Sequence, residues 1–178
     1  LPKRGKNIER SYDEVSLPKE YIPLYNISKN NITARHVLKY LKFRGFTKND
    51  ILKYNVGYCD EGEYKGHIIL PSYDASFKLN YFIARTYAES SYIKYKNPPV
   101  TKDVIGLESF VNFNVPITIC EGIFDAIAIK RNVIPLFGKE MSNELKKVLA
   151  LSKVKKIYIA LDMDAMKQAI RHAKDLLD

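Results

Sequence analysis

The sequence predicts an α+β N-terminal subdomain followed by an α/β domain with a Rossmann-like parallel sheet. In the second half, apolar strand-like runs alternate with helix-forming segments, and this order predicts parallel strands with right-handed crossovers. In the first half, two helical segments precede strand-like runs separated by turn residues. We therefore divide the 178 residues into an N-terminal tether (1–30), a basic α+β subdomain (31–110) and the α/β domain (111–178).

The N-terminal segment predicts an extended tether. Its first ten residues are basic and lack hydrophobic periodicity, and Pro18 and Pro23 interrupt the residues that follow. The start also lacks the apolar stretch of a signal peptide. Because position 1 is Leu rather than Met, we expect the chain to be a fragment or a processed product.

Two short helices are expected after the tether. Residues 31–41 carry an apolar stripe at helical spacing, with Thr33 as the expected N-cap. Residues 47–54 predict a second helix, which Thr47 would cap.

Strands are expected next. Residues 57–66 are rich in turn formers, and a strand over 67–71 is expected to stop at its proline. A hairpin turn at 72–77 leads to a second strand at 78–86. Residues 92–96 alternate apolar and basic side chains, which predicts one packed side and one cationic side.

The second half predicts three strands, each followed by a helix. Ser142 is the expected cap of the middle helix. The strands cover 117–120, 133–137 and 157–161, and the helices cover 124–131, 143–151 and 165–177.

Carboxylates follow the first and third of these strands. Glu121 comes directly after residues 117–120, and Asp162 and Asp164 come after residues 157–161. Ligands of open α/β sheets bind outside the carboxyl ends of the strands, so these three side chains are expected to meet at one edge. Three close carboxylates repel each other, and a divalent cation is the simplest way to hold them.

Simpler roles compete for the same acidic residues. Asp162 and Asp164 stand at a strand–helix junction, where Asp often caps a helix. Asp125 lies in the first turn of a predicted helix, where it would complement the helix dipole.

Composition restricts the classes of partner. Lys and Arg outnumber Asp and Glu by 29 to 20, which favours polyanions such as nucleic acid, although a basic soluble protein would show the same excess. Cys59 and Cys120 are too few for a zinc cluster, so zinc is not expected in this chain. No apolar run reaches the length of a membrane span, and a reducing cytoplasmic location fits.

Motifs in the second half resemble the Toprim domain, the metal-binding module of bacterial-type primases, topoisomerases and some nucleases. The resemblance lies in Glu121-Gly122-x-x-Asp125-Ala126 and in Asp162-x-Asp164, each placed after a predicted strand.

The first half resembles the catalytic core of DnaG-like primases. The residues that carry this resemblance are Tyr40-Leu41-Lys42-Phe43-Arg44-Gly45-Phe46, Val56-Gly57-Tyr58, Gly66-His67-Ile68-Ile69-Leu70-Pro71, Phe82-Ile83-Ala84-Arg85, Lys94-Tyr95-x-Asn97-x-Pro99, and Lys102 before Ile105-Gly106-Leu107.

The resemblance implies a DNA primase that makes short RNA primers on a single-stranded DNA template. Such an enzyme uses ribonucleoside triphosphates, works with a replicative helicase that is fused or separate, and needs Mg²⁺ or Mn²⁺, with two ions expected. Asp162 and Asp164 would be catalytic metal ligands, Glu121 would be a third ligand or a general base that helps deprotonate the attacking hydroxyl, and Asp125 would orient these carboxylates. DNA or nucleotide phosphates would contact Arg85, Lys94 and Lys102, with Arg44, Lys96 and Lys139 as further candidates.

The sequence departs from the family pattern at three places. Asp164 is followed by Ala165-Met166-Lys167, whereas the family pattern Asp-x-Asp-x-Ala-Gly has a glycine in this stretch. Lys139 replaces a family threonine. The family's further acidic residues would lie beyond Asp178, so we expect a Toprim domain truncated at its C-terminus. The family's zinc and helicase parts are also not in this sequence, and the divergence is typical of a phage or mobile-element member.

Two other functions use the same features. A Toprim-type nuclease would cut phosphodiesters with the same carboxylates, although the basic first half favours a primase. A non-catalytic module that binds single-stranded nucleic acid would keep the basic residues and a vestigial acidic edge.

Overall fold

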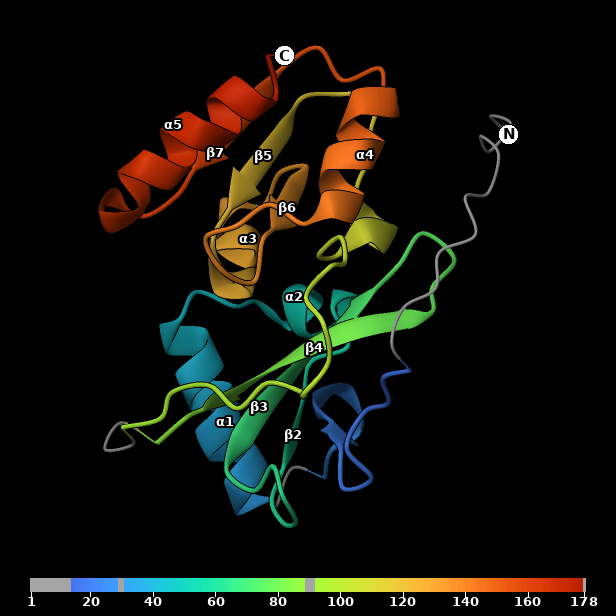
Figure 1. The fold of residues 1–178 in the computed structure, drawn as a ribbon. Helices are drawn as coiled ribbons and strands as arrows, with labels where there is room; N and C mark the ends of the chain where they lie inside the picture. Colours follow the sequence, from blue (N-terminus) through green and yellow to red (C-terminus); the bar gives the residue numbers. More distant parts are fainter. Residues whose placement is uncertain (1–13, 29–30, 89–91, 178) are drawn as a thin grey trace.

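The computed structural model describes residues 14–28, 31–88 and 92–177. These residues form a four-stranded antiparallel sheet of order β1-β2-β3-β4 and a three-stranded parallel sheet of order β6-β5-β7. Figure 1 shows the parallel sheet with α3, α4 and α5 in the upper part of the molecule, above the antiparallel sheet with α1 and α2. The predicted sequence of an α+β part and an α/β part is confirmed.

Side-chain caps begin the first two helices. Helix α1 (Ile32–Phe43) starts where Asn31 Oδ1 accepts a hydrogen bond from the Ala34 amide at 2.8 Å. The prediction that Thr33 caps this helix is wrong, because Thr33 already lies inside the first turn. The predicted Thr47 cap of α2 (Lys48–Lys53) is confirmed, since Thr47 and Asp50 form a reciprocal capping box.

The antiparallel sheet is larger than predicted. It consists of β1 (Ile22–Pro23), β2 (Gly57–Cys59), β3 (His67–Tyr73) and β4 (Leu79–Thr86). Strand β3 does not end at Pro71, which lies opposite Phe82. Because β2 pairs only as far as Ile69, β3 has no second neighbour at Pro71, and the missing amide removes no hydrogen bond on that side.

Part of the N-terminal segment that the structure describes, residues 14–28, belongs to this sheet, and the basic residues 1–10 lie outside the described range. Ile22 pairs with Tyr58, which makes β1 an edge strand, and a 3₁₀ turn, η1 (Leu24–Asn26), follows it. Val15, Leu17 and Tyr21 pack against the sheet face that contains Phe82 and Ala84. The described part of the expected tether is therefore packed along the subdomain.

The segment after β4 only partly follows its prediction. Arg85 and Tyr95 form a single antiparallel bridge, flanked by backbone hydrogen bonds from Thr86 to Lys94 and from Lys96 to Ala84. The expected packed side is wrong, because Ile93 is 72% exposed. The segment contacts β4 through its backbone, so its apolar side chains are not held against a core.

The parallel sheet has β5 (Ile117–Cys120) at its centre, between β6 (Val133–Pro135) and β7 (Ile157–Ala160). Strand β6 is shorter than predicted because Phe137 turns with φ 55°. The Ser142 cap is confirmed by its hydrogen bond from the Leu145 amide. The helices are α3 (Ile123–Ile129), α4 (Asn143–Leu151) and α5 (Met166–Asp175), and a 3₁₀ turn, η3 (Met163–Ala165), precedes α5.

Residues 102–107 tie the two sheets together. The Asn80 side chain donates to the Ile105 carbonyl at 3.0 Å, and the Leu107 amide donates to Ser72 Oγ at 2.9 Å. On the other side, Ser142 Oγ donates to the Val104 carbonyl at 2.9 Å. A 3₁₀ turn, η2 (Glu108–Phe110), follows this segment.

One hydrophobic cluster contains residues from both sides of position 110. It includes Tyr58, Leu70 and Tyr81 from the antiparallel sheet together with Phe124 and Ile127 from α3. A second cluster packs α4 on the parallel sheet. The two sheets are thus joined by a continuous core, and the division near residue 110 stays a prediction. Among the described residues, no helix combines the length and apolar character needed to cross a lipid bilayer.

Candidate metal and nucleic-acid site

Three carboxylates meet at the C-terminal edge of the parallel sheet. Glu121 follows β5, and Asp162 and Asp164 follow β7, whose Ala160 lies beside Cys120 of β5. One oxygen from each carboxylate can be chosen so that all three lie within 4.8 Å of one another. The sheet topology therefore brings together the three carboxylates that were predicted from the sequence to meet at one edge.

The Glu121 carboxyl is in an unfavourable place for a negative charge. Burial, followed by the neighbouring Asp162 carboxylate, raises the pKa of Glu121, and Lys139 opposes this shift. Glu121 Oε2 is buried and has no hydrogen-bond partner among the described residues. A buried oxygen without a partner, beside two further carboxylates, fits a hard divalent cation such as Mg²⁺.

Asp162 does not act as a helix cap. It occupies the residue before η3, yet its side chain makes no capping hydrogen bond. The interpretation of Asp162 as a plain cap is therefore not supported, and its exposed carboxylate is free of that role.

Asp164 pairs with Lys139. The Lys139 ammonium lies 2.5 Å from Asp164 Oδ2. This hydrogen bond lowers the pKa of Asp164 and raises the pKa of Lys139. Lys139 was expected to contact phosphate, and the structure places it instead against a candidate metal ligand.

Asp125 has a structural role in the described chain. Its Oδ2 accepts a hydrogen bond from the Gly122 amide at 3.2 Å, at the start of α3. A Cβ at Gly122 would lie 2.8 Å from the same oxygen, so this turn favours glycine. Asp125 is not one of the three clustered carboxylates, but its charge acts on Glu121. It therefore supports the loop that carries Glu121.

Arg85 is surrounded by aromatic side chains. Its Nε donates to the Tyr40 hydroxyl at 2.7 Å, and its Nη1 donates to the Tyr95 hydroxyl. Its Cζ lies 4.8 Å from the centre of the Tyr95 ring and 5.1 Å from that of Phe124. Arg44 contacts the same Phe124 ring at 5.3 Å. Two of the predicted phosphate-binding residues thus share one support, in the helix that begins after Glu121.

The predicted lysines lie in different surroundings. Lys102 Nζ donates to the Phe137 carbonyl at 3.0 Å, in the loop that leads to Lys139. Lys96 instead pairs with Glu63 at 3.3 Å, and Lys94 is exposed. The structure therefore brings Arg85 and Arg44 to the same ring and holds Lys102 at the Phe137 carbonyl, whereas Lys96 is paired with Glu63.

The sequence reasoning missed the aromatic residues around Arg85. Tyr40 lies in the motif of residues 40–46, Tyr95 in that of residues 94–99 and Phe124 in that of residues 121–126, but none of the three was predicted to contact Arg85. Tyr40 and Tyr95 stand beside Lys39, Lys94 and Lys96 in the sequence, which was an available signal, whereas Phe124 has no basic neighbour and could not be found in this way.

Relatives decide the family. No family model matches the sequence. The chain is 33% identical to the uncharacterized protein MG010 of Mycoplasma genitalium over 165 residues, which cover 86% of this chain and 73% of that protein. The chain belongs to the MG010 family. The MG010 homolog of Mycoplasma pneumoniae is 29% identical over 149 residues, covering 79% of this chain and 70% of the homolog.

Solved structures identify the fold of this MG010 family member. A DnaG primase catalytic domain bound to ssDNA matches it with a TM-score of 0.69 and 14% identity, over 83% of this chain and 61% of that one. The E. coli primase catalytic core matches with a TM-score of 0.67 and 15% identity, over 83% and 62%. The fold is that of the DnaG primase catalytic core, and the chain spans about three fifths of the solved cores' length.

Proposed function

We propose that this chain is the catalytic part of a DNA primase, which joins ribonucleotides on a single-stranded DNA template. One observation carries the proposal: the cluster of Glu121, Asp162 and Asp164 lies at the sheet edge from which α3 begins, and α3 also supports Arg85. A carboxylate cluster that can hold metal thus adjoins a cationic surface that suits a polyanion.

Glu121, Asp162 and Asp164 would hold Mg²⁺ or Mn²⁺. The metal would supply the charge that stabilises the attacking and leaving oxygens when a 3′-hydroxyl displaces pyrophosphate from a triphosphate. The protein's task in such a reaction is mainly to position the reactants and to place charges.

Arg85 would bind template or nucleotide phosphate. Its guanidinium has donors in a fixed fork, and Tyr40 and Tyr95 hold two of them. Lys94 and Lys102 would add point charges. Arg44, which contacts the same Phe124 ring as Arg85, would add a further positive charge for phosphate. Lys96 would reach a template only after leaving Glu63.

The partners follow from this role. They are a single-stranded DNA template, ribonucleoside triphosphates and a replicative helicase, fused or separate, and the site of action is the cytoplasm. Among the proteins of this fold, one catalytic domain is bound to ssDNA, and bacteriophage T7 primase domains of gp4 are bound to an RNA/DNA hybrid. These neighbours support single-stranded DNA as the ligand to test first.

Primer synthesis tests the proposal. The chain, with Mg²⁺ or Mn²⁺, single-stranded templates of varied sequence and labelled ribonucleotides, is expected to give short products. Asp162→Asn and Glu121→Gln should lower the yield at least about a hundredfold, because each removes negative charge that would hold the metal. Lys147→Met, which changes an exposed lysine paired with Glu144, is the matched control.

A nuclease would use the same carboxylates, so plasmid cleavage is measured beside synthesis. Metal-dependent cleavage without primer products would replace the primase by a nuclease. Binding of single-stranded DNA with neither activity, and with no effect of the carboxylate variants, would support a non-catalytic module.

A further inference from the structure

Lys139 introduces a fixed positive charge into the carboxylate cluster. Its ammonium contacts Asp164 at 2.5 Å and also interacts electrostatically with Glu121 and Asp162. The Lys139 side chain is 36% exposed and the Asp164 side chain is 72% exposed, so the pair lies at the surface edge of the cluster. A protein cation therefore occupies part of the space where the metal would bind.

The loop that carries Lys139 is held on both sides of that residue. Lys102 donates to the Phe137 carbonyl at 3.0 Å, and the Gly138 amide donates to the Glu121 carbonyl at 3.3 Å. The Phe137 ring also stacks on Tyr81, with ring centres 5.2 Å apart. These contacts fix the residues before Lys139 against the cluster and against the antiparallel sheet.

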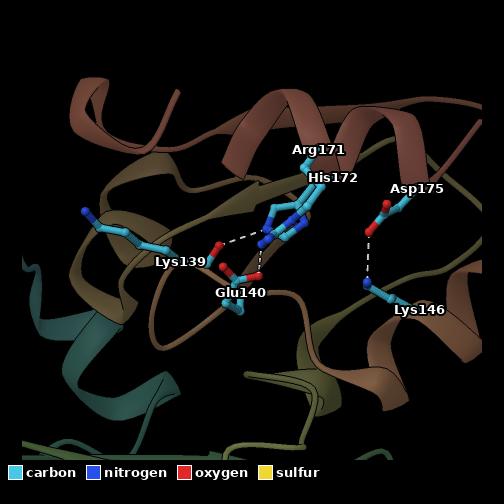
Figure 2. A network of polar contacts seen from close by, with 6 residues as sticks. All are labelled: Lys139, Glu140, Lys146, Arg171, His172 and Asp175. Atoms are coloured by element: carbon cyan, nitrogen blue, oxygen red, sulfur yellow. Dashed lines mark hydrogen bonds and ion pairs between the residues drawn. The ribbon is translucent and has the colours of Figure 1, made fainter. Parts of the chain in front are cut away.

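Helix α5 fixes the backbone of Lys139 itself. His172, which is 0% exposed, donates from Nε2 to the Lys139 carbonyl at 2.8 Å. Figure 2 shows this bond and the pairing of Glu140 with Arg171 beside it, while the Lys139 side chain extends in the opposite direction.

A second ion pair holds the same helix further along. Lys146 of α4 pairs with Asp175 of α5 at 2.8 Å, also drawn in Figure 2. Helix α5 is thus connected both to the Lys139 loop and to α4. The backbone of Lys139 is therefore anchored, and this fixes the direction in which its side chain extends toward Asp164.

We propose that Lys139 is a built-in cation that takes the place of one of two divalent ions. Three carboxylates and one ammonium leave two negative charges, which one divalent ion neutralises. The remaining ion would lie nearer to Glu121 and Asp162 than to Asp164, because Lys139 contacts Oδ2 of Asp164 and leaves only its other oxygen for the metal. This inference rests on the proposed function and revises the expectation of two ions.

Manganese binding without nucleotide tests the inference. Free Mn²⁺ is counted by electron paramagnetic resonance during titration of the wild-type chain, Lys139→Met and the control Lys147→Met. Wild type and control should bind one ion. Lys139→Met should bind the first ion about tenfold or more tightly, because a positive charge a few ångströms from the metal is gone, and should gain a second, weaker ion.

Crystals soaked in Mn²⁺ locate the ions by anomalous scattering. In the wild type, one peak beside Glu121 and Asp162, with Lys139 still on Asp164, supports the inference, and in Lys139→Met a further peak at Asp164 is expected. Two peaks in the wild type with Lys139 displaced would overturn it. Equal number and affinity of ions in wild type and Lys139→Met would also overturn it.

Two controls separate this result from other failures. Thermal unfolding shows whether Lys139→Met still folds, and Lys139→Arg, which keeps the charge, should keep the one-ion stoichiometry. The number of bound ions does not depend on primer synthesis. A chain that makes no primers would contradict the proposed function, and the metal-binding measurements alone would then decide the role of Lys139.

Discussion

The guanidinium carbon of Arg85 lies 5.1 Å from the centre of the Phe124 ring, a contact that joins β4 to α3. Helix α3 begins just after Glu121, so the contact links the basic surface to the loop that carries a candidate metal ligand. A substitution at Arg85 should therefore affect nucleic-acid binding directly. Phe124 connects Arg85 to the helix that follows Glu121.

Replacing Arg85 by Ala should weaken binding of single-stranded DNA. The loss of a phosphate contact is expected to raise the dissociation constant by about fivefold to thirtyfold. It should also reduce the salt slope, the dependence of log K on the logarithm of the salt concentration, by about one. Fluorescence anisotropy at several salt concentrations measures both quantities.

Arg35→Ala is the matched control, because Arg35 is exposed on α1. An unchanged salt slope for Arg85→Ala, or an equal loss of affinity in Arg35→Ala, would show that Arg85 makes no phosphate contact of its own.

Tyr40→Phe should weaken template binding less than Arg85→Ala does. The substitution keeps the ring and removes only the hydroxyl that accepts from Arg85 Nε at 2.7 Å. Arg85 keeps its charge and its other contacts, so the loss of this one hydrogen bond, about 0.5–1.5 kcal/mol net, should raise the dissociation constant by roughly threefold to tenfold with little change in the salt slope.

Tyr25→Phe, at a tyrosine that is 58% exposed, is the control for Tyr40→Phe. In the Arg85→Ala background, Tyr40→Phe should have no further effect, because the partner is gone. Equal effects in the two backgrounds would mean that Tyr40 acts independently of Arg85.

Local chemistry determined what could be predicted from the sequence. The Thr47 cap and the Ser142 cap depend on neighbours within a few positions, and both are confirmed. The alternation of strands and helices from β5 to α5, which local hydrophobic runs indicate, is confirmed as well. Glu121, Asp162 and Asp164 could be selected because parallel strands end at one edge.

Contacts between distant segments could not be predicted. The surroundings of Arg85 come from α1, α3 and residue 95, which no periodicity relates. The continuation of β3 through Pro71 depends on how short β2 is. The ion pair of Lys139 with Asp164 joins two loops of different strands, and charge counting along the chain does not reveal it.

Divalent metal should stabilise the folded chain. The carboxylate cluster exists only when β5 and β7 pair, so the metal binds the native state and shifts unfolding by mass action. Mn²⁺ at a hundred times its dissociation constant should add about 2.7 kcal/mol, which corresponds to a rise of roughly 5–10 °C in Tm for a chain of this size.

Scanning calorimetry with Mn²⁺ and with a chelator measures that rise. The double variant Glu121→Gln, Asp162→Asn should lose it. A rise of the same size in the double variant would locate the stabilising ion away from the cluster.

Gly106→Ala should destabilise the whole chain. Gly106 lies in the segment that ties the two sheets together, and a Cβ there would come within 2.3 Å of the Pro135 carbonyl oxygen and 2.8 Å of the Pro135 ring. Backbone on both sides must shift to make room, since neighbouring Ile105 and Leu107 are buried. We expect a loss of about 1–3 kcal/mol in the free energy of unfolding, measured with urea.

Gly138→Ala is the comparison for this glycine, because a Cβ at Gly138 meets no atom within 4 Å. Its effect on stability should stay within about 0.5 kcal/mol. If the two alanine variants lost equal stability, close packing of residues 102–107 against β6 would not be what holds the sheets together. If Gly106→Ala alone unfolds in two transitions, the sheets fold as separable units and this segment is their coupling.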